Sequence, residues 1–343
     1  MSRLFALVLP VLFAPLAAAP AQQPKDKKLT LQAAAEMKFQ VQGHVHEVAV
    51  SPDGKLVAVG TEDVFLYDIS GADPKKVAFF DSTVGFGITT LTFTPDGKHV
   101  VFGGRDWTVR VWGVEGRRET GRVKEHRSDV RSVAVSPDGK LVASGSQDRT
   151  AILWDLGEDG SLKEKHVIRA DGASGDAIQA VAFVSKGKGL YTVTPQGTFR
   201  GYTLAKGEPK LTGGFKPPKG GVGSACIVPN AAGTLFAVAD NAAVHLVTPT
   251  GTAAGSLAGP AGHKDDVTGV SFSADGKHVA TCGRDGAVIV WDVATKAARY
   301  TKVRPGTFSD VAFSPYVNAV TGEMTLAACQ DDGTVHVVRL APR

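Results

Sequence analysis

Cysteine is scarce in this chain of 343 residues, which contains only Cys226, Cys282 and Cys329. They form no CxxC or CxxCH motif, so the sequence offers neither a disulfide framework nor a haem-attachment site. Runs of basic residues are also lacking, because 38 basic and 34 acidic residues are dispersed along the chain. This dispersion argues against nucleic acid as a partner, which would call for concentrated positive charge.

Long apolar runs are lacking apart from one near the N-terminus, Leu4 to Ala19, which follows a basic residue and precedes small residues. This pattern predicts a signal peptide at residues 1–21 and export to the periplasm or the extracellular space. The run is shorter than the ~20 residues that span a bilayer, and an uncleaved anchor is the alternative. We expect residues 22–36, which are polar, to form a linker, and no transmembrane segment to remain after signal removal.

Glycine is abundant, with 40 residues, and short alternating apolar segments recur between turn-forming sequences. Seven such turns follow one another at intervals of roughly 40 to 50 residues. They begin at Ser51, Thr94, Ser136, Ser185, Val228, Ser273 and Ser314, with SPDGK, TPDGK and SADGK as the best-preserved forms. Each turn is preceded by one alternating strand and followed by two more, which predicts an all-β chain of seven four-stranded antiparallel units.

Two of these units share a set of four polar residues at identical spacing. In both, a histidine precedes an aspartate by 22 residues, a hydroxyl residue precedes it by four, and a tryptophan follows it by six. The sets are His126, Ser144, Asp148 and Trp154 in the third unit, and His263, Thr281, Asp285 and Trp291 in the sixth. With the WD pairs at both tryptophans, the chain resembles the WD-repeat β-propeller family, and with the apolar leader it resembles an exported bacterial type. The resemblance implies a seven-bladed propeller.

The resemblance also implies a structural role for these sets. In the family the tryptophan donates a hydrogen bond to the hydroxyl, the hydroxyl to the histidine, and the histidine to the aspartate, all inside one blade. A nucleophilic triad would instead need an exposed serine beside an oxyanion site. Because Ser144 lies within a strand and recurs as Thr281, we predict that the sets are structural. We expect no catalytic residue, no metal and no cofactor.

The other units depart from this pattern to differing degrees. The first keeps Gly43 and His44, which we interpret as its structural histidine, and the second keeps Asp106 and Trp112 but has Phe102 at the hydroxyl position. The fourth, fifth and seventh units are degenerate. They have Tyr202, Val247 and Val338 at the tryptophan position.

The cysteines fit this repeat as core residues. The central residue of each innermost strand is small, and we interpret Cys226 as one of these. Cys282 and Cys329 occupy equivalent positions in neighbouring units. Facing sheets stand ~10 Å apart, which exceeds the reach of a disulfide, so we expect all three thiols to be free and buried.

The chain ends predict how the ring closes. The last unit ends at Thr334–Leu340 without a strand for its outer edge, and Glu36–Gln42 precedes the first complete unit. We expect these two segments to pair, because closure removes exposed sheet edges. The predicted organisation is therefore a signal peptide (1–21), a linker (22–36) and a propeller (37–343).

The resemblance places a partner-binding surface at positions three and five after each histidine and one before each aspartate. These residues are Asp129, Arg131, Gln147, Asp266, Thr268 and Arg284, with Arg105 equivalent in the second unit. Trp107 stands where a small or polar turn residue is expected, which makes it our best candidate for a binding anchor. The alternative is that it packs half-buried on Phe86 or Phe102.

The implied function is a rigid, non-catalytic scaffold, a monomer that presents its rim to another protein of unknown identity. The alternative is an exported propeller enzyme with a substrate or metal site at the central channel. Such a site needs several His, Asp or Glu side chains that converge from different units. The starts of the inner strands offer a mixed set instead: His46, Thr89, Arg131, Gln179, Gly223, Thr268 and Ser309.

Overall fold

The computed structural model describes residues 31–81, 87–169, 176–184, 187–204, 208–215, 227–230, 232–317 and 320–342. The expected signal peptide (1–21), Cys226, Phe86 and Gly223 lie outside the described residues. Within them, no helix is long and apolar enough to cross a membrane.

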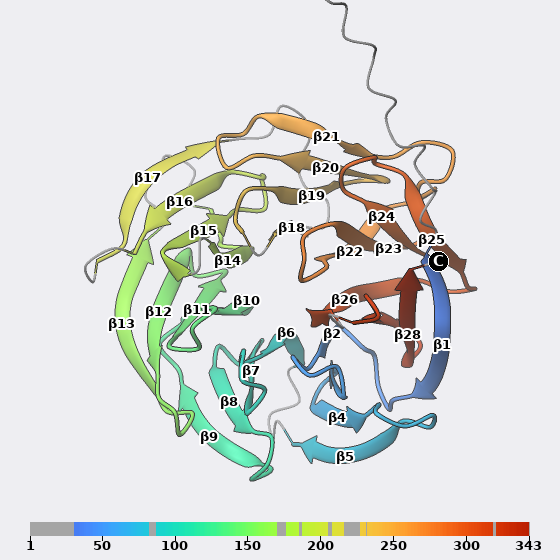
Figure 1. Cartoon of the computed structure of the whole chain (residues 1–343). Helices are drawn as coiled ribbons and strands as arrows, with labels where there is room; N and C mark the ends of the chain where they lie inside the picture. Colours follow the sequence, from blue (N-terminus) through green and yellow to red (C-terminus); the bar gives the residue numbers. More distant parts are fainter. Residues whose placement is uncertain are drawn as a thin grey trace, which may run out of the picture.

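Seven four-stranded antiparallel sheets surround a central axis, as predicted (Figure 1). Blade one contains β2 (Glu47–Val50), β3 (Leu56–Gly60), β4 (Val64–Asp68) and β5 (Lys75–Phe80). Blade two contains β6 (Ile88–Phe93), β7 (His99–Gly104), β8 (Val109–Gly113) and β9 (Arg118–Val123). Blade three contains β10 (Val130–Val135), β11 (Leu141–Ser146), β12 (Thr150–Leu156) and β13 (Leu162–Arg169).

The remaining four blades repeat the same meander from the axis outward. Blade four contains β14 (Ala180–Val184), β15 (Gly189–Val193), β16 (Phe199–Thr203) and β17 (Lys210–Phe215), and blade five contains β18 (Ile227–Pro229), β19 (Phe236–Asp240), β20 (Ala243–Val247) and β21 (Ala253–Leu257). Blade six contains β22 (Val267–Phe272), β23 (His278–Gly283), β24 (Ala287–Asp292) and β25 (Ala298–Val303). Blade seven contains β26 (Phe308–Val317), β27 (Met324–Gln330), β28 (Thr334–Pro342) and β1 (Leu31–Gln40).

Local turn chemistry explains why the first two strands of a blade form a hairpin. In blade one, Ser51 donates to the Asp53 carboxylate (2.6 Å), the amide of Lys55 donates to the same oxygen, and the amide of Leu56 donates to Ser51 (2.9 Å). Gly54 lies between them with a φ of 70°, a conformation that glycine adopts without strain. The turns that begin at Thr94, Ser136 and Ser273 repeat the hydroxyl-to-aspartate bond. The turn sequence therefore sets where each hairpin forms.

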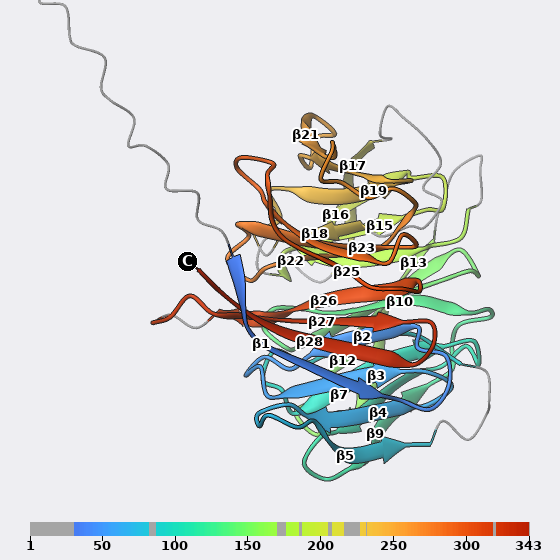
Figure 2. The ribbon, with the colours of Figure 1, turned by 90° about the vertical axis from the view of Figure 1, so that its right-hand side faces the viewer.

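The N-terminal strand closes the ring, as predicted, but it begins earlier than expected. β1 pairs antiparallel with β28, with Met37 opposite Val337, and completes blade seven (Figures 1 and 2). The pairing extends to Leu31 opposite Pro342, so residues 31–36 belong to a strand and not to the expected linker. The physical reason is that β28 continues to Pro342 and offers backbone partners along its whole length, while Leu31 is buried in the core between blades six and seven.

The core consists of apolar clusters packed between neighbouring blades, made mainly of valine, leucine and phenylalanine. Cys282 and Cys329 are buried and form no disulfide, as predicted for these two residues. Burial raises the pKa of the Cys329 thiol, so it behaves as a small apolar side chain.

Candidate functional site

The polar set of blade three forms a continuous chain of hydrogen bonds in the interior. Trp154 Nε1 donates to Ser144 Oγ (2.9 Å), Ser144 Oγ lies 2.7 Å from His126 Nε2, and His126 Nδ1 lies 2.9 Å from Asp148 Oδ2. Ser144 and Trp154 are fully buried. A buried serine hydroxyl that is already bonded on both sides cannot reach a substrate, so the set holds strands together.

Blade six contains the same chain with a threonine hydroxyl. Trp291 Nε1 donates to Thr281 Oγ1 (2.9 Å), His263 Nε2 lies 2.8 Å from that oxygen, and His263 Nδ1 lies 3.0 Å from Asp285. The amide of Lys264 also donates to Asp285 (2.8 Å). The aspartate thus joins the loop before the inner strand to the turn between the second and third strands.

Ionisation of the two aspartates follows from these contacts. Burial alone would raise the pKa of Asp148, but hydrogen bonds from His126, Thr150 and the amide of Arg127 outweigh it and lower that pKa. The pKa of Asp285 is lowered in the same way, with His263 as the main donor against burial. Both groups are therefore carboxylates at neutral pH, as the hydrogen-bond chain requires.

Blade two has no hydroxyl residue to bond its tryptophan, and it uses Phe80 and Arg110, which the sequence pattern did not indicate, in the interior of the blade. Phe102 leaves Trp112 Nε1 buried without a hydrogen-bond partner, and the indole packs against Phe80 instead, with ring centroids 4.3 Å apart. The buried Arg110 forms an ion pair with Asp106. A cation from the third strand therefore takes the place of the histidine.

The interpretation of His44 as a structural histidine is wrong. Its side chain is exposed, and its Nδ1 lies 2.9 Å from the backbone oxygen of Asp331 in blade seven. The physical reason lies at the hydroxyl position of blade one. Val59 pairs with Val48 as Ser144 pairs with Val133, so Val59 occupies the place of the hydroxyl residue. A valine side chain cannot form a hydrogen bond with an imidazole. The rings of His44 and His46 lie 4.7 Å apart at the rim.

Trp107 lies on the rim of blade two, in the turn between β7 and β8. Its side chain is 43% exposed, and Lys124 Nζ lies 5.5 Å from the centre of its ring. Phe102 is buried in the core of the blade. The backbone of Trp107 has a φ of 70°, which is strained for a bulky residue.

The other predicted surface residues separate into two groups. Arg105, Gln147 and Arg284 are exposed, and Arg284 lies 3.8 Å from Asp266. Asp129 and Arg131 are partly buried and form an ion pair of 3.3 Å. The hydroxyl of Thr268 donates to the backbone oxygen of Phe308 (2.6 Å), so it links blade six to blade seven.

The central channel contains two carboxyl groups that the sequence prediction missed. A cavity of about 570 Å³ runs along the inner strands, and Glu47 and Asp310 line it together with His46, Arg131, Gln179 and Ser309. Burial and the neighbouring Asp310 raise the pKa of Glu47 well above its usual range, and burial raises the pKa of Asp310 to about 6. The sequence did contain an indication of these two groups, because Glu47 follows His46 and Asp310 follows Ser309, which are two of the predicted starts of inner strands.

These carboxyl groups belong to a series of contacts between the inner strands of neighbouring blades. Glu47 accepts from the amide of Leu91, and Asp310 accepts from the amide of Val48 (3.1 Å). The hydroxyls of Thr90 and Ser132 accept in the same way from the amides of Val133 (3.1 Å) and Val181 (3.2 Å). The inner strand of a blade is a sheet edge, and each side chain satisfies an amide that would otherwise be unpaired.

The geometry of the channel limits what chemistry it can perform. In the part of the chain that the structure describes, no three His, Cys, Asp or Glu side chains come together to hold a metal ion. The two carboxyl groups could accept or donate a proton, but both already accept backbone hydrogen bonds.

Comparisons with known families support a WD-repeat propeller. Residues 117–155 and 256–292 match the model of the WD domain, G-beta repeat, and these ranges contain the whole hydrogen-bond chains of blades three and six. Residues 11–125 match the model of the lactonase with a seven-bladed beta-propeller. Both models describe propellers or their repeats.

The curated proteins that are similar to part of the chain include two subunits of target of rapamycin complexes. Target of rapamycin complex subunit LST8 of Saccharomyces cerevisiae is 32% identical over 92 residues, which are 26% of this chain and 30% of that protein. Target of rapamycin complex subunit wat1 of Schizosaccharomyces pombe is 27% identical over 121 residues, which are 35% and 38% of the two chains. The match thus spans about a third of the length of each relative.

Replacing Asp148 with alanine is expected to lower the free energy of unfolding by about 2 to 4 kcal/mol, because several charge-assisted hydrogen bonds are lost at once. The lowered pKa means that this contribution is present above about pH 4 and is lost as the pH falls below it. Urea unfolding at pH 7 and at pH 2.5 measures both effects, because the lowered pKa keeps Asp148 largely ionised until the pH falls well below 4. Asp155→Ala, at the half-exposed member of the same WD pair, is the control and should cost less than about 1 kcal/mol. Equal losses in the two variants would contradict the structural role.

Replacing Glu47 with glutamine is expected to change how stability depends on pH. The pKa values of Glu47 and Asp310 are higher in the folded chain than in the unfolded chain, so the folded state is favoured while both groups are protonated, below about pH 4. This contribution to stability is lost as the pH rises through about 6 and above, where the buried groups ionise. Glutamine keeps an acceptor for the Leu91 amide without the charge. The stability of the variant relative to the native chain should therefore increase by about 1 to 3 kcal/mol between pH 5 and pH 8. Urea unfolding at both pH values tests this, and a difference that is constant with pH would contradict it.

Proposed function

We propose that this chain is a non-catalytic scaffold that binds another protein through the rim of blades two and three, centred on Trp107. The observation that carries the proposal is the backbone strain at this exposed aromatic residue. The equivalent turn positions of blades six and seven are Gly286 and Gly333, with φ of 71° and 87°, and blade three has Arg149 there, with φ of 72°, so both strained side chains lie on the rim of blades two and three. A left-handed conformation costs a residue other than glycine about 1 to 2 kcal/mol. Strain of this kind is typical of functional positions, and exposed tryptophans dominate binding energy at interfaces.

The charges around Trp107 indicate the chemistry of the partner. Several cationic side chains are exposed at this end of blades two and three, among them Arg105, Lys124, Arg127 and Arg149. A partner with an acidic surface and an apolar side chain for the indole would complement them. Both curated relatives carry names that describe subunits of a complex, which supports a scaffold.

We also propose that the chain acts in an exported compartment, as an exported bacterial type of WD-repeat propeller and as a monomer. The support is the apolar run at Leu4 to Ala19 and its cleavage-site pattern.

A second candidate function is hydrolysis of a lactone at the central channel. It is favoured by the lactonase-model match at residues 11–125 and by the carboxyl groups of Glu47 and Asp310. Incubation with simple lactones at pH 5 to 8 tests it. Hydrolysis that is present in the native chain and absent in Glu47→Gln would favour the enzyme over the scaffold.

Replacing Trp107 with glycine is expected to abolish partner capture while it changes the free energy of unfolding by less than about 1 kcal/mol, because relief of the strain offsets the lost packing. Cross-linking in the native envelope, with captured proteins identified by mass spectrometry, measures capture. Arg117→Gly is the matched control, because Arg117 also has a positive φ (47°) but lies in the turn at the opposite end of blade two. Equal capture by the native chain and Trp107→Gly would contradict the proposal.

A further inference from the structure

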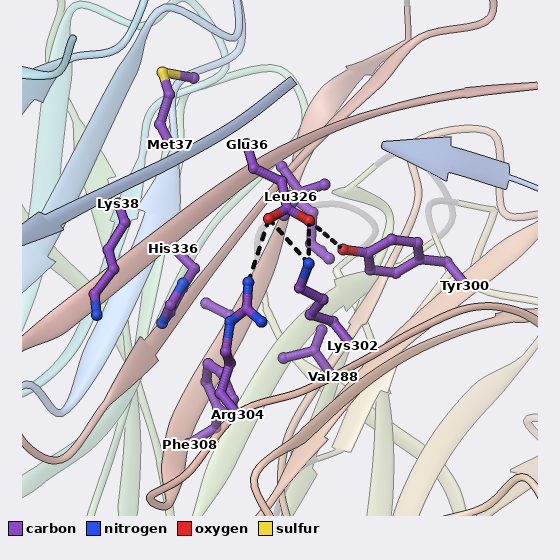
Figure 3. A pocket seen from close by; sticks show the side chains of 12 residues that line it. Glu36, Met37, Lys38, Val288, Tyr300, Lys302, Arg304, Phe308, Leu326 and His336 are labelled. Carbon is purple, nitrogen blue, oxygen red and sulfur yellow. Dashed lines mark hydrogen bonds and ion pairs between the residues drawn. The ribbon is translucent and has the colours of Figure 1, made fainter. Parts of the chain in front are cut away.

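A cavity of about 180 Å³ lies between blades six and seven, and its lining shares no residue with that of the central channel (Figure 3). Strands β24 and β25 form one wall, and β26, β27, β28 and β1 form the other. The floor is apolar and includes Val288, Phe308, Leu326, Ala328 and Val338. Such a space inside an otherwise close-packed protein calls for an explanation.

The strand register explains why the cavity is there. Trp154 pairs with Val142 and Trp291 pairs with Val279, and in blade seven the residue at the corresponding place, opposite Leu326, is Val338. Two residues after Leu326, where blades three and six have Ser144 and Thr281, blade seven has Ala328.

The histidine position is changed as well. His126 and His263 each precede the first residue of their inner strand by four residues, and Arg304 precedes Phe308 by the same number. Blade seven therefore replaces an indole by an isopropyl group, a hydroxyl by a methyl group, and an imidazole by a guanidinium. The space that the indole and its partners fill in blades three and six is left open toward blade six.

The mouth of this cavity already holds a carboxylate. Figure 3 shows the Glu36 carboxylate between Lys302 (2.9 Å), Tyr300 (3.2 Å) and Arg304 (3.4 Å). The hydrogen bond from Lys302 lowers the pKa of Glu36. The 3.4 Å contact is the weakest of the three, so most of the Arg304 donors are not committed to Glu36.

The lining has an excess of positive charge. Lys38, Lys302 and Arg304 are cations, and Glu36 is the single carboxylate among the lining residues. Burial lowers the pKa of His336 to about 4, helped by Lys38 and Arg304, so this imidazole is neutral at pH 7. Its Nε2 lies 3.0 Å from Gln330 Oε1. Lys38 is paired with His336 in the strand register and extends on the same side.

We propose that this cavity binds a small monocarboxylate that carries one ring or a branched apolar group of similar size. The apolar group occupies the place of the missing indole, and the carboxylate binds Arg304 and Lys38 at the mouth. The size is appropriate, because an apolar cavity of about 150 Å³ binds benzene. The site is separate from the Trp107 rim, and its occupation does not depend on the function proposed above.

Isothermal titration calorimetry of the full chain at pH 7 with phenylacetate tests this. We expect a dissociation constant of about 0.1 to 1 mM for a ligand of this size. Phenylacetamide, which lacks the charge, and acetate, which lacks the ring, should each bind at least about tenfold more weakly. Absence of phenylacetate binding, or equal binding of phenylacetamide, overturns the proposal.

Two variants locate the site. Val338→Trp places an indole in the cavity and should abolish phenylacetate binding. Arg304→Gln leaves the cavity open and should weaken phenylacetate binding about tenfold. This variant tests the site even if Val338→Trp disturbs folding. Arg118→Gln removes an exposed cation from the start of β9 in blade two and is the matched control, with an unchanged dissociation constant. Native affinity in Arg304→Gln, or equal weakening in Arg118→Gln, would show that phenylacetate binds elsewhere.

Discussion

Filling the gap between each blade and the one before it is the constraint on which the rest of this structure depends. The sheets diverge as they run outward from the axis, so a large side chain is needed where the third strand faces the preceding blade. Blades three and six use Trp154 and Trp291, and a hydroxyl, a histidine and an aspartate satisfy the indole N–H and one another. Burial of so many polar groups is tolerated because each has a partner, and the chain of partners fixes one arrangement of the strands.

The same constraint separates structural residues from residues available for function. Ser144, His126 and Asp148 have the composition of a catalytic triad, but their hydrogen bonds are already used inside the blade. Side chains at the channel are committed in a similar way, since they satisfy the edge amides of the next inner strand. What remains is the rim, where Trp107 is strained and exposed, and the gap before blade seven, where Val338 is too small to fill the space.

The architecture and the two buried hydrogen-bond chains could be predicted from the sequence, because they follow from patterns of residues that lie close together in the chain. The turn signatures determined the number of blades, and the spacing of His126, Ser144, Asp148 and Trp154 indicated which residues meet. Prediction failed where the outcome depends on residues distant in sequence. His44 matches the pattern but has Val59 where a hydroxyl would be needed, and Asp310 meets Val48 across 262 residues. The sequence already placed Val338 at the tryptophan position, but the cavity there depends on Glu36, Tyr300 and Arg304, which come together only in the fold.

The most direct test of this account is a double-mutant cycle on the free energy of unfolding, with Ser144→Ala and Trp154→Phe measured singly and together. Phenylalanine keeps most of the apolar bulk and removes only the indole N–H, so the cycle isolates the hydrogen bond from the packing. We predict a coupling of about 1 kcal/mol, with the double variant more stable than the sum of the single losses. Strictly additive losses would contradict the claim that the buried polar chain holds the blade together as a unit.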